Sequence, residues 1–325
     1  MGSNHNFLDR FNHHFEKINE ALDKNFSSRI PLMNNIGQHS LLGEGKRLRP
    51  LLFVLACELC GYQGEDVYKL STIFEFIHTA SLLHDDVLDN AELRRKKPSA
   101  NHLWGSSAAV LSGDFFYSKA SDMAVDYKNF QFLKMLTNTT LRMTEGQIME
   151  LENTHNWRIK KEEYMEIIIS KTAILLASTC ACAAIAAGAE NRKINEMKAF
   201  GMDLGIAFQL IDDILDYTSC VEEFGKPVGK DLKEGKITLP LIYTLSNFEN
   251  AEIQRFEELF KNQEATEEDY EKMITLVRND GVLEKIRSEA EEHVNKASGL
   301  ISAYPESPAK NQLLSLNTYL IRRHF

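Results

Sequence analysis

Apolar residues recur along this chain at the spacing of an α-helix. Near the N-terminus, apolar residues step by four, four, three and four positions from Phe7 to Leu22, which places them on one face of a helix. No alternating strand pattern and no strand–helix–strand rhythm accompanies this periodicity. We therefore expect an all-α fold. The further segments with helical periodicity are 50–60, 66–93, 130–151, 162–188, 194–218 and 238–247.

The composition excludes some classes of function. The chain has 325 residues, 43% of them hydrophobic, so it is long enough to bury a large core. Its net charge of −10 argues against a nucleic-acid partner, because phosphate backbones are bound by basic surfaces. Five cysteines fit reduced thiols in a cytoplasmic protein.

One run of residues resembles a membrane span. Residues 172–189, TAILLASTCACAAIAAGA, are apolar and long enough to be considered as a span. However, the run consists mostly of Ala, Ser, Thr and Cys and has no aromatic belt. We expect a tightly packed buried helix here, and no membrane span. The N-terminal residues also lack the continuous apolar segment of a signal peptide.

Two clusters of aspartates stand out within the apolar helical runs. The segments LLHDDVLD and QLIDDILD share the pattern DDxxD. The first aspartate of this pattern is Asp85 in one segment and Asp212 in the other, 212 − 85 = 127 residues apart. Residues at i, i+3 and i+4 share a helix face, where like charges cost ~0.2–0.5 kcal/mol per pair. A solvated helix face is the alternative for one cluster, but its repetition favours binding of a multivalent cation. Mg²⁺ fits, because it takes one or two carboxylates together with phosphate oxygens. The predicted metal ligands are Asp85, Asp86, Asp89, Asp212 and Asp216.

Basic residues occur in four places that suit a phosphate ligand. GEGKRLRP precedes a helix start marked by Pro50, and GKPVGKDLKEGK (225–236) has the composition of a mobile basic lid. Each site alone is also compatible with ordinary surface charge. Together with the acidic clusters they indicate metal-assisted departure of a diphosphate, which leaves an allylic cation in a dry apolar pocket. The basic residues are Lys46, Arg47, Arg49, Arg94, Arg95, Lys171, Lys226, Lys230, Lys233 and Lys236.

The order of these motifs resembles the trans (E) polyprenyl diphosphate synthases across nearly the full chain. The motifs are GxGKRLRP, HxxxLxHDDxxDxxxxRR, SKTA, FQxxDDxxD and GKxxGxDxxxGKxTLP. Within the family the chain looks most similar to long-chain synthases of the octaprenyl type, which make quinone side chains. The resemblance implies a single domain over residues 1–325, an isoprenoid-synthase-type helical bundle around one central cavity, a homodimer and Mg²⁺ dependence. The implied substrates are isopentenyl diphosphate and an allylic diphosphate, either farnesyl or geranylgeranyl.

The resemblance also implies roles for individual residues. Lys46, Arg49, His78 and Arg95 match positions that bind isopentenyl diphosphate. Arg94, Lys171, Thr172, Gln209 and Lys226 match positions around the allylic diphosphate, and Lys236 matches a lid contact. The predicted catalytic residues are Asp85, Asp89, Lys171 and Asp212. For His78 the alternative is a hydrogen-bonded histidine of the core. The lid holds one residue more than in shorter-chain relatives, which weakens the match at Lys236.

Small residues before the first cluster bear on product length. Ser81 and Ala80 lie four and five residues before Asp85, close to its face of the helix. In the family, a bulky aromatic residue there blocks the tunnel, whereas small residues leave it open. We therefore expect a long product, with Met135 on the next long helix as the tunnel floor. Helix packing alone is another reason for small residues at these positions.

Three other functions compete with a long-chain synthase. The first is a synthase that makes the shorter farnesyl or geranylgeranyl product. The second is a terpene cyclase, which the second aspartate cluster and the GKRLRP site argue against. The third is a non-catalytic subunit of a heteromeric synthase, which would not need to retain both clusters.

Overall fold

The structure, a computed structural model, describes residues 5–43, 45–218, 228–261 and 264–321. These residues are mainly helical, as predicted. In chain order the elements are α1 (His5–Leu8), η1 (Asp9–Phe11), α2 (Asn12–Asn25), α3 (Pro31–Ser40), α4 (Leu48–Leu59), α5 (Val67–Leu88), β1 (Leu93–Arg94), β2 (Lys97–Pro98), α6 (Ala100–Trp104), α7 (Ser106–Asp126), α8 (Phe130–Glu152), α9 (Lys161–Ile168), the π-helical turn η2 (Ile169–Ala173), α10 (Ile174–Ala186), α11 (Asn191–Thr218), α13 (Lys230–Lys233), α14 (Leu239–Leu245), α15 (Asn250–Lys261), α16 (Glu267–Asn279), α17 (Val282–Ser302) and α18 (Pro308–Ile321).

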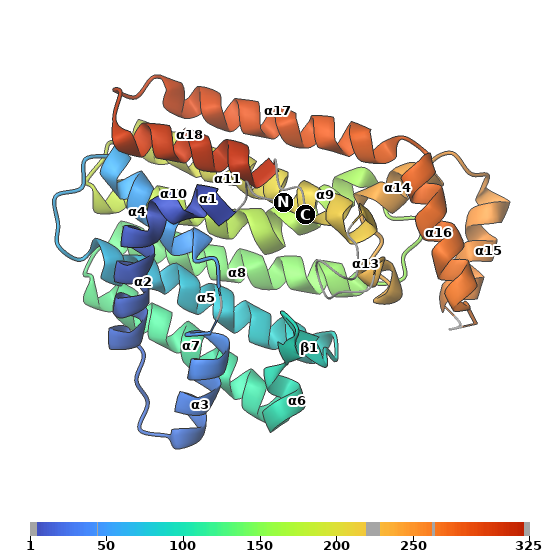
Figure 1. Cartoon of the computed structure of the whole chain (residues 1–325), viewed down its shortest axis with the longest axis horizontal. Helices are drawn as coiled ribbons and strands as arrows, with labels where there is room; N and C mark the ends of the chain where they lie inside the picture. The colour runs from blue at the N-terminus through green and yellow to red at the C-terminus, as the bar shows by residue number, and fades with distance from the viewer. Residues whose placement is uncertain (1–4, 44, 219–227, 262–263, 322–325) are drawn as a thin grey trace.

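The long helices stack in layers (Figure 1). α10 packs against α4, α8 and α11, while α5 packs against α4 and α7, and α17 covers α11. One apolar core lies among α4, α5, α8 and α10, and a second lies among α9, α11, α14, α16 and α17. The two aspartate clusters are carried at the ends of α5 and α11, so the packing of these helices decides whether the clusters meet.

The small-residue run lies in the centre of the molecule. α9, η2 and α10 form one helical run, Lys161–Ala186, with a mean hydropathy of 1.8 over its most apolar window, of which 78% is buried inside the protein. A Cβ at Gly201 of α11 would lie 2.4 Å from the Leu176 carbonyl oxygen, and one at Gly205 would lie 2.5 Å from Ala173 Cα. The run is therefore a core helix whose small residues allow α11 to pack closely.

A short hairpin is the one departure from the all-helical expectation that we find among the described residues. β1 and β2 pair antiparallel, with Leu93 opposite Pro98 and Arg94 opposite Lys97. The two turn residues, Arg95 and Lys96, have φ values of +52° and +64°. A two-residue hairpin turn favours positive φ at both central positions, usually with Asn or Gly. The hairpin thus holds Arg95 in a strained backbone conformation directly after the first aspartate cluster.

Candidate active site

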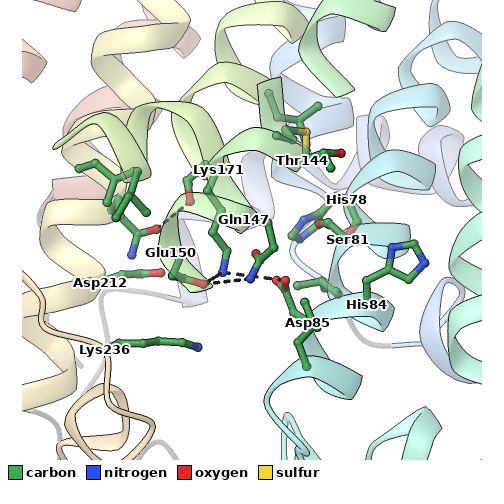
Figure 2. A pocket seen from close by; sticks show the side chains of 18 of the residues that line it. His78, Ser81, His84, Asp85, Thr144, Gln147, Glu150, Lys171, Asp212 and Lys236 are labelled. Carbon is green, nitrogen blue, oxygen red and sulfur yellow. Dashed lines mark hydrogen bonds and ion pairs between the residues drawn. The ribbon is translucent and has the colours of Figure 1, made fainter. Parts of the chain in front are cut away.

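A cavity of about 780 Å³ separates the two aspartate-bearing helices. Asp85 of α5 and Asp212 of α11 both line it, as Figure 2 shows. Much of the remaining wall is apolar, including Leu82, Met143 and Phe208. The fold therefore brings two clusters that are 212 − 85 = 127 residues apart in sequence to one cavity with polar and apolar walls.

Lysines neutralise the first cluster. Lys171 Nζ lies 2.5 Å from Glu150 Oε2 and 3.9 Å from Asp85 Oδ1. Lys236 Nζ donates to both oxygens of Asp89 at 3.0 Å. Burial alone would lower the pKa of Lys236, but the carboxylates of Glu150, Asp89 and Glu234 raise it, so this lysine stays cationic. Burial raises the pKa of Asp85 despite the nearby charge of Lys171.

The second residue of the first cluster faces away from the cavity. Arg94 Nε donates to Asp86 Oδ1 at 2.7 Å and to Oδ2 at 2.8 Å, and the Asp86 side chain is buried. Adjacent residues of a helix point about 100° apart, so Asp86 cannot share the face of Asp85. The structure thus differs from the prediction that Asp86 binds metal, and it assigns this carboxylate to holding Arg94.

The residues of the second cluster also divide between different surroundings. Asp213 is buried against Tyr164 and Gln209, and burial raises its pKa. Asp216 does not line the cavity; its two oxygens accept the backbone N–H groups of Lys230 at 3.1 Å and Asp231 at 3.2 Å. Asp212 and the buried Asp213 are the two residues of this cluster that line the cavity.

One segment joins the two clusters. Residues 228–236, the described part of the predicted lid, contact Asp216 through the backbone of α13 and contact Asp89 through Lys236. Asp231 and Lys236 line the cavity. The last aspartate of each cluster therefore fixes the same segment. Lys226, predicted to contact the allylic diphosphate, lies outside the described residues.

The acidic side chains suit a cation that a substrate helps to bind. Among the described residues, no group of three His, Cys, Asp or Glu side chains is placed to hold a metal ion by itself. Mg²⁺ usually binds one or two carboxylates and completes its shell with water and phosphate oxygens. Asp85 and Asp212 line the cavity from facing helices and fit that arrangement, in which a diphosphate supplies the remaining ligands. Asp89 does not line the cavity, but both of its oxygens bond Lys236, which does.

Several arginines lie near His78, which lines the cavity. Burial lowers the pKa of His78 well below its usual value, and the positive charges of Arg49, Arg94 and Arg95 lower it further. A Cβ at Gly45 would lie 3.2 Å from Arg95 Nη1, so the GKRLRP loop and the hairpin are in close contact. His78 and Arg49 both line the cavity. The predicted isopentenyl diphosphate residues are therefore brought together, except that Lys46 is exposed.

Arg47 serves a different purpose from its neighbours Lys46 and Arg49. Its Nη1 donates to Glu75 Oε1 at 2.9 Å, its Nε to Asn19 Oδ1 at 3.1 Å and its Nη2 to the Gly43 carbonyl at 2.9 Å. The Arg47 and Glu75 side chains are 6% and 7% exposed. The structure therefore removes Arg47 from the predicted phosphate-binding set and makes it the anchor of the loop.

Three of the residues predicted for the allylic diphosphate meet at the π-helical turn, whereas Arg94 is bonded to Asp86 and does not line the cavity. Thr172 Oγ1 donates to Gln209 Oε1 at 3.1 Å, and Lys171, Thr172 and Gln209 all line the cavity. A Cβ at Gly146 of α8 would lie only 2.6 Å from the Lys171 backbone nitrogen, so α8 packs directly on this turn. Single π-helical turns are rare and are often found at functional sites.

Three polar residues of α8 in the cavity wall, Thr144, Gln147 and Glu150, were not predicted from the sequence. Gln147 Nε2 donates to Glu150 Oε2 at 3.1 Å, and the same oxygen contacts Lys171 (Figure 2). The sequence signal of Gln147 and Glu150 is a polar pair at i and i+3 directly after Gly146, which is weak by itself.

The residues predicted to set product length are only partly at the cavity. Ser81 lines it, with its hydroxyl bonded to the His78 carbonyl at 2.9 Å, whereas Ala80 is fully buried in the core behind the wall. Met135 packs against the core and does not line the cavity. Met143, eight residues later on α8, does line it, so the structure does not place Met135 as the floor of this cavity.

These observations define a class of protein: an all-α enzyme that holds diphosphates between two acidic helices and a basic end. A family model described as polyprenyl synthetase matches residues 30–277, and the chain belongs to this family. It is 36% identical to octaprenyl diphosphate synthase of Escherichia coli (strain K12) over 306 residues, covering 94% of each chain. It is 35% identical to the geranyl-diphosphate-specific all-trans-nonaprenyl-diphosphate synthase of Rhodobacter capsulatus over 312 residues, covering 95% of this chain and 94% of the relative.

Solved structures agree with this assignment. The polyprenyl synthase of Caulobacter crescentus CB15, crystallised with calcium and isoprenyl diphosphate, matches with a TM-score of 0.92 and 32% identity. The match covers 98% of this chain and 97% of the other. The predicted family, the isoprenoid-synthase-type fold and the assignment as a trans-polyprenyl diphosphate synthase are therefore confirmed.

Proposed function

We propose that this protein condenses isopentenyl diphosphate with farnesyl or geranylgeranyl diphosphate to build a trans-polyprenyl diphosphate of octaprenyl length. The observation that carries the proposal is the single cavity with Asp85 and Asp212 on facing helices and Arg49 and His78 in its wall. The condensation brings together two diphosphates, and this cavity offers an acidic region for one of them and a basic region for the other. The similarity to octaprenyl and nonaprenyl synthases supports a long product, which would serve as a quinone side chain.

The geometry supports ionisation followed by carbon–carbon bond formation. The allylic C1–O bond breaks, and the diphosphate departs with the electron pair next to the cationic Lys171 and Lys236. The double bond of isopentenyl diphosphate, held by Arg49, His78 and Arg95, then attacks C1. The product forms when C2 gives a proton to an oxygen of the departed diphosphate. Apolar wall residues exclude the water that would quench the cation. Mg²⁺, held by Asp85, Asp89 and Asp212, would neutralise charge on the departing group.

Product analysis tests this proposal. The purified protein alone is incubated with Mg²⁺, farnesyl diphosphate and labelled isopentenyl diphosphate, and the products are separated by chain length. We expect a polyprenyl alcohol of octaprenyl length after dephosphorylation. A farnesyl or geranylgeranyl product would support a short-chain synthase, a cyclic hydrocarbon would support a terpene cyclase, and no turnover would support a non-catalytic subunit.

The basic loop yields a prediction about substrate affinity. Arg49→Ala and Lys46→Ala should weaken isopentenyl diphosphate binding roughly 10- to 150-fold, because a charge-assisted hydrogen bond contributes ~1.5–3 kcal/mol. Binding of the allylic substrate should change much less. Separate titrations of each substrate measure the difference, with Lys272→Ala as the control, since Lys272 is exposed and pairs with Glu268 on α16. Equal weakening of both substrates would contradict the assignment.

The cavity wall yields a prediction about product length. Ser81→Phe places a ring in the cavity and should shorten the product to about the geranylgeranyl or farnesyl length while turnover continues. Ala80→Phe is the matched control: its ring would enter the packed core, and we expect a destabilisation of ~1–3 kcal/mol. Chromatography and melting temperatures are measured together. A folded, active Ser81→Phe enzyme with the wild-type product would exclude this tunnel path.

We also propose a homodimer that forms through α7 and α8. These neighbouring helices expose several large apolar side chains, which are Leu111, Val125, Phe130, Leu141, Ile148 and Leu151. Scattered apolar residues are normal on a surface, but a cluster on two adjacent helices is typical of an interface. Light scattering should give twice the chain mass, and Leu141→Asp should lower the measured mass. A monomeric wild type would contradict the proposal.

We propose a cytoplasmic location, supported by the free thiols of Cys57, Cys60, Cys180 and Cys182.

A further inference from the structure

A buried chain of hydrogen bonds leads from α9 to the π-helical turn. The Tyr164 hydroxyl donates to Asp213 Oδ2, Gln209 Nε2 donates to Asp213 Oδ1 at 3.0 Å, and Thr172 Oγ1 donates to Gln209 Oε1 at 3.1 Å. Tyr164 is 5% exposed and Asp213 is 1% exposed. All four residues line the cavity. The chain therefore ends at two residues of the allylic site and begins at two residues to which the mechanism above assigns no role.

The hydrogen bonds of the four groups run in one direction. Tyr164 donates its hydroxyl proton to one carboxyl oxygen of Asp213, and Gln209 donates an amide N–H to the other. The Gln209 amide is thereby oriented with its oxygen toward Thr172. Thr172 must then use its single proton toward Gln209, and its remaining lone pairs are left for other partners. The orientation of both cavity residues follows from one carboxylate.

Asp213 is separated in role from the aspartate next to it. Asp212 and Asp213 point about 100° apart on α11, and Asp213 is directed to Tyr164 across the contact between α9 and α11. A hydrogen-bonded buried carboxyl group has little freedom to turn, because losing its donors leaves buried polar oxygens unpaired. Tyr164 thus holds Asp213 in the rotamer that Gln209 needs.

We infer that Tyr164 and Asp213 are positioning residues, which orient Gln209 and Thr172 toward the allylic substrate. This inference rests on the proposed function, since it assigns the role within the allylic site. It predicts that loss of the Tyr164 hydroxyl disturbs the chemical step rather than the binding of isopentenyl diphosphate, which uses residues at α4 and α5.

Tyr164→Phe tests the inference. We expect kcat to fall about tenfold or more, the size expected when a buried carboxylate loses one donor, while KM for isopentenyl diphosphate stays within about twofold. The matched control is Tyr243→Phe on α14, where the hydroxyl likewise bonds a carboxylate, that of Glu289, but does not line the cavity. This control should keep wild-type turnover. An unchanged kcat in Tyr164→Phe would overturn the inference.

A double-mutant cycle separates positioning from general destabilisation. In a Gln209→Leu background the hydroxyl has no amide left to orient, so adding Tyr164→Phe should lower kcat by less than about twofold further. If the two losses of kcat instead multiply, Tyr164 acts independently of Gln209 and the inference is wrong.

Should Tyr164→Phe not fold, Asp213→Asn is compared with Asp213→Ala. Asn retains an acceptor for Gln209, so it should be at least about tenfold more active, and equal activity would overturn the inference.

Two measurements keep this test distinct from the test of the proposed function. Wild-type turnover of farnesyl and isopentenyl diphosphate establishes the reaction before any variant is compared. Inorganic pyrophosphate with Mg²⁺ then serves as the binding probe for the diphosphate site, and in Tyr164→Phe its affinity should fall by much less than kcat does. A loss of pyrophosphate affinity as large as the loss of kcat would assign Tyr164 to building the diphosphate site and would overturn the positioning role.

Discussion

Asp212→Ala should lower kcat by at least ~10²–10³-fold, the loss seen when a group that stabilises transition-state charge is removed. Asp212 is the one carboxylate of its cluster that lines the cavity apart from the buried, hydrogen-bonded Asp213. Asp85→Ala should have an effect of the same size from the opposite wall. Steady-state turnover of farnesyl and isopentenyl diphosphate measures both variants.

The fold should survive these two substitutions. Aspartates one turn apart repel each other, so removing one relieves repulsion when no cation is bound. The matched control is Asp203→Ala on the same helix, where the carboxylate bonds His293 at 2.7 Å outside the cavity and should not affect turnover. Wild-type turnover that persists in excess EDTA would contradict the role of the clusters as metal sites.

The second large effect concerns stability. Glu75→Ala should lower the free energy of unfolding by ~3–5 kcal/mol, because it leaves the buried guanidinium of Arg47 without its carboxylate. The loop that carries Arg49 should loosen as well, since Arg47 ties it to α2 and α5. Urea unfolding measures the stability. Titration with isopentenyl diphosphate measures the substrate affinity, which should fall if the loop loosens.

Two comparisons sharpen this prediction. Removing both charges in Arg47→Met/Glu75→Leu should cost much less than Glu75→Ala, because no unpaired buried charge remains. Glu268→Ala breaks an exposed ion pair with Lys272 on α16 and should leave the free energy of unfolding close to that of the wild type. If Glu75→Ala is as mild as Glu268→Ala, the buried pair does not anchor the loop.

Helical periodicity was sufficient to predict where most of the fold lies. The segment predicted at 194–218 is α11, Asn191–Thr218, and the segment at 130–151 is α8, Phe130–Glu152. The small-residue run was correctly predicted to be buried, because closely packed helices need small side chains. These features depend on residues within one segment, which is why a sequence shows them.

The different surroundings of the aspartates within each cluster could not be predicted in the same way. Asp86 and Asp213 are the same residue type as their neighbours, and their surroundings are set by Arg94 and Tyr164, which come from other segments of the chain. Arg47 is hidden from sequence patterns for a related reason. It adopts a φ of +46°, rare for a residue other than Gly, and its partner Glu75 lies on another helix.

Met135 lies away from the cavity for a geometric reason. Depth along α8 was inferred from sequence distance, but which side chains face the cavity depends on the rotation of α8 against α5 and the π-helical turn. Met143, Thr144 and Gln147 occupy the facing positions instead, and Met135 packs in the core. Product-length variants on α8 are therefore best made at Met143 and Thr144.

The central claim is that both aspartate clusters hold one allylic diphosphate through metal ions. It is tested by titrating a non-reactive thio analogue of farnesyl diphosphate with and without Mg²⁺, in the wild type, Asp85→Asn, Asp212→Asn and the double variant. We predict that Mg²⁺ tightens wild-type binding by about tenfold or more, that each single variant loses most of this gain, and that the double variant is hardly weaker than either single one. Affinity that is independent of Mg²⁺, or losses that multiply in the double variant, would contradict the claim.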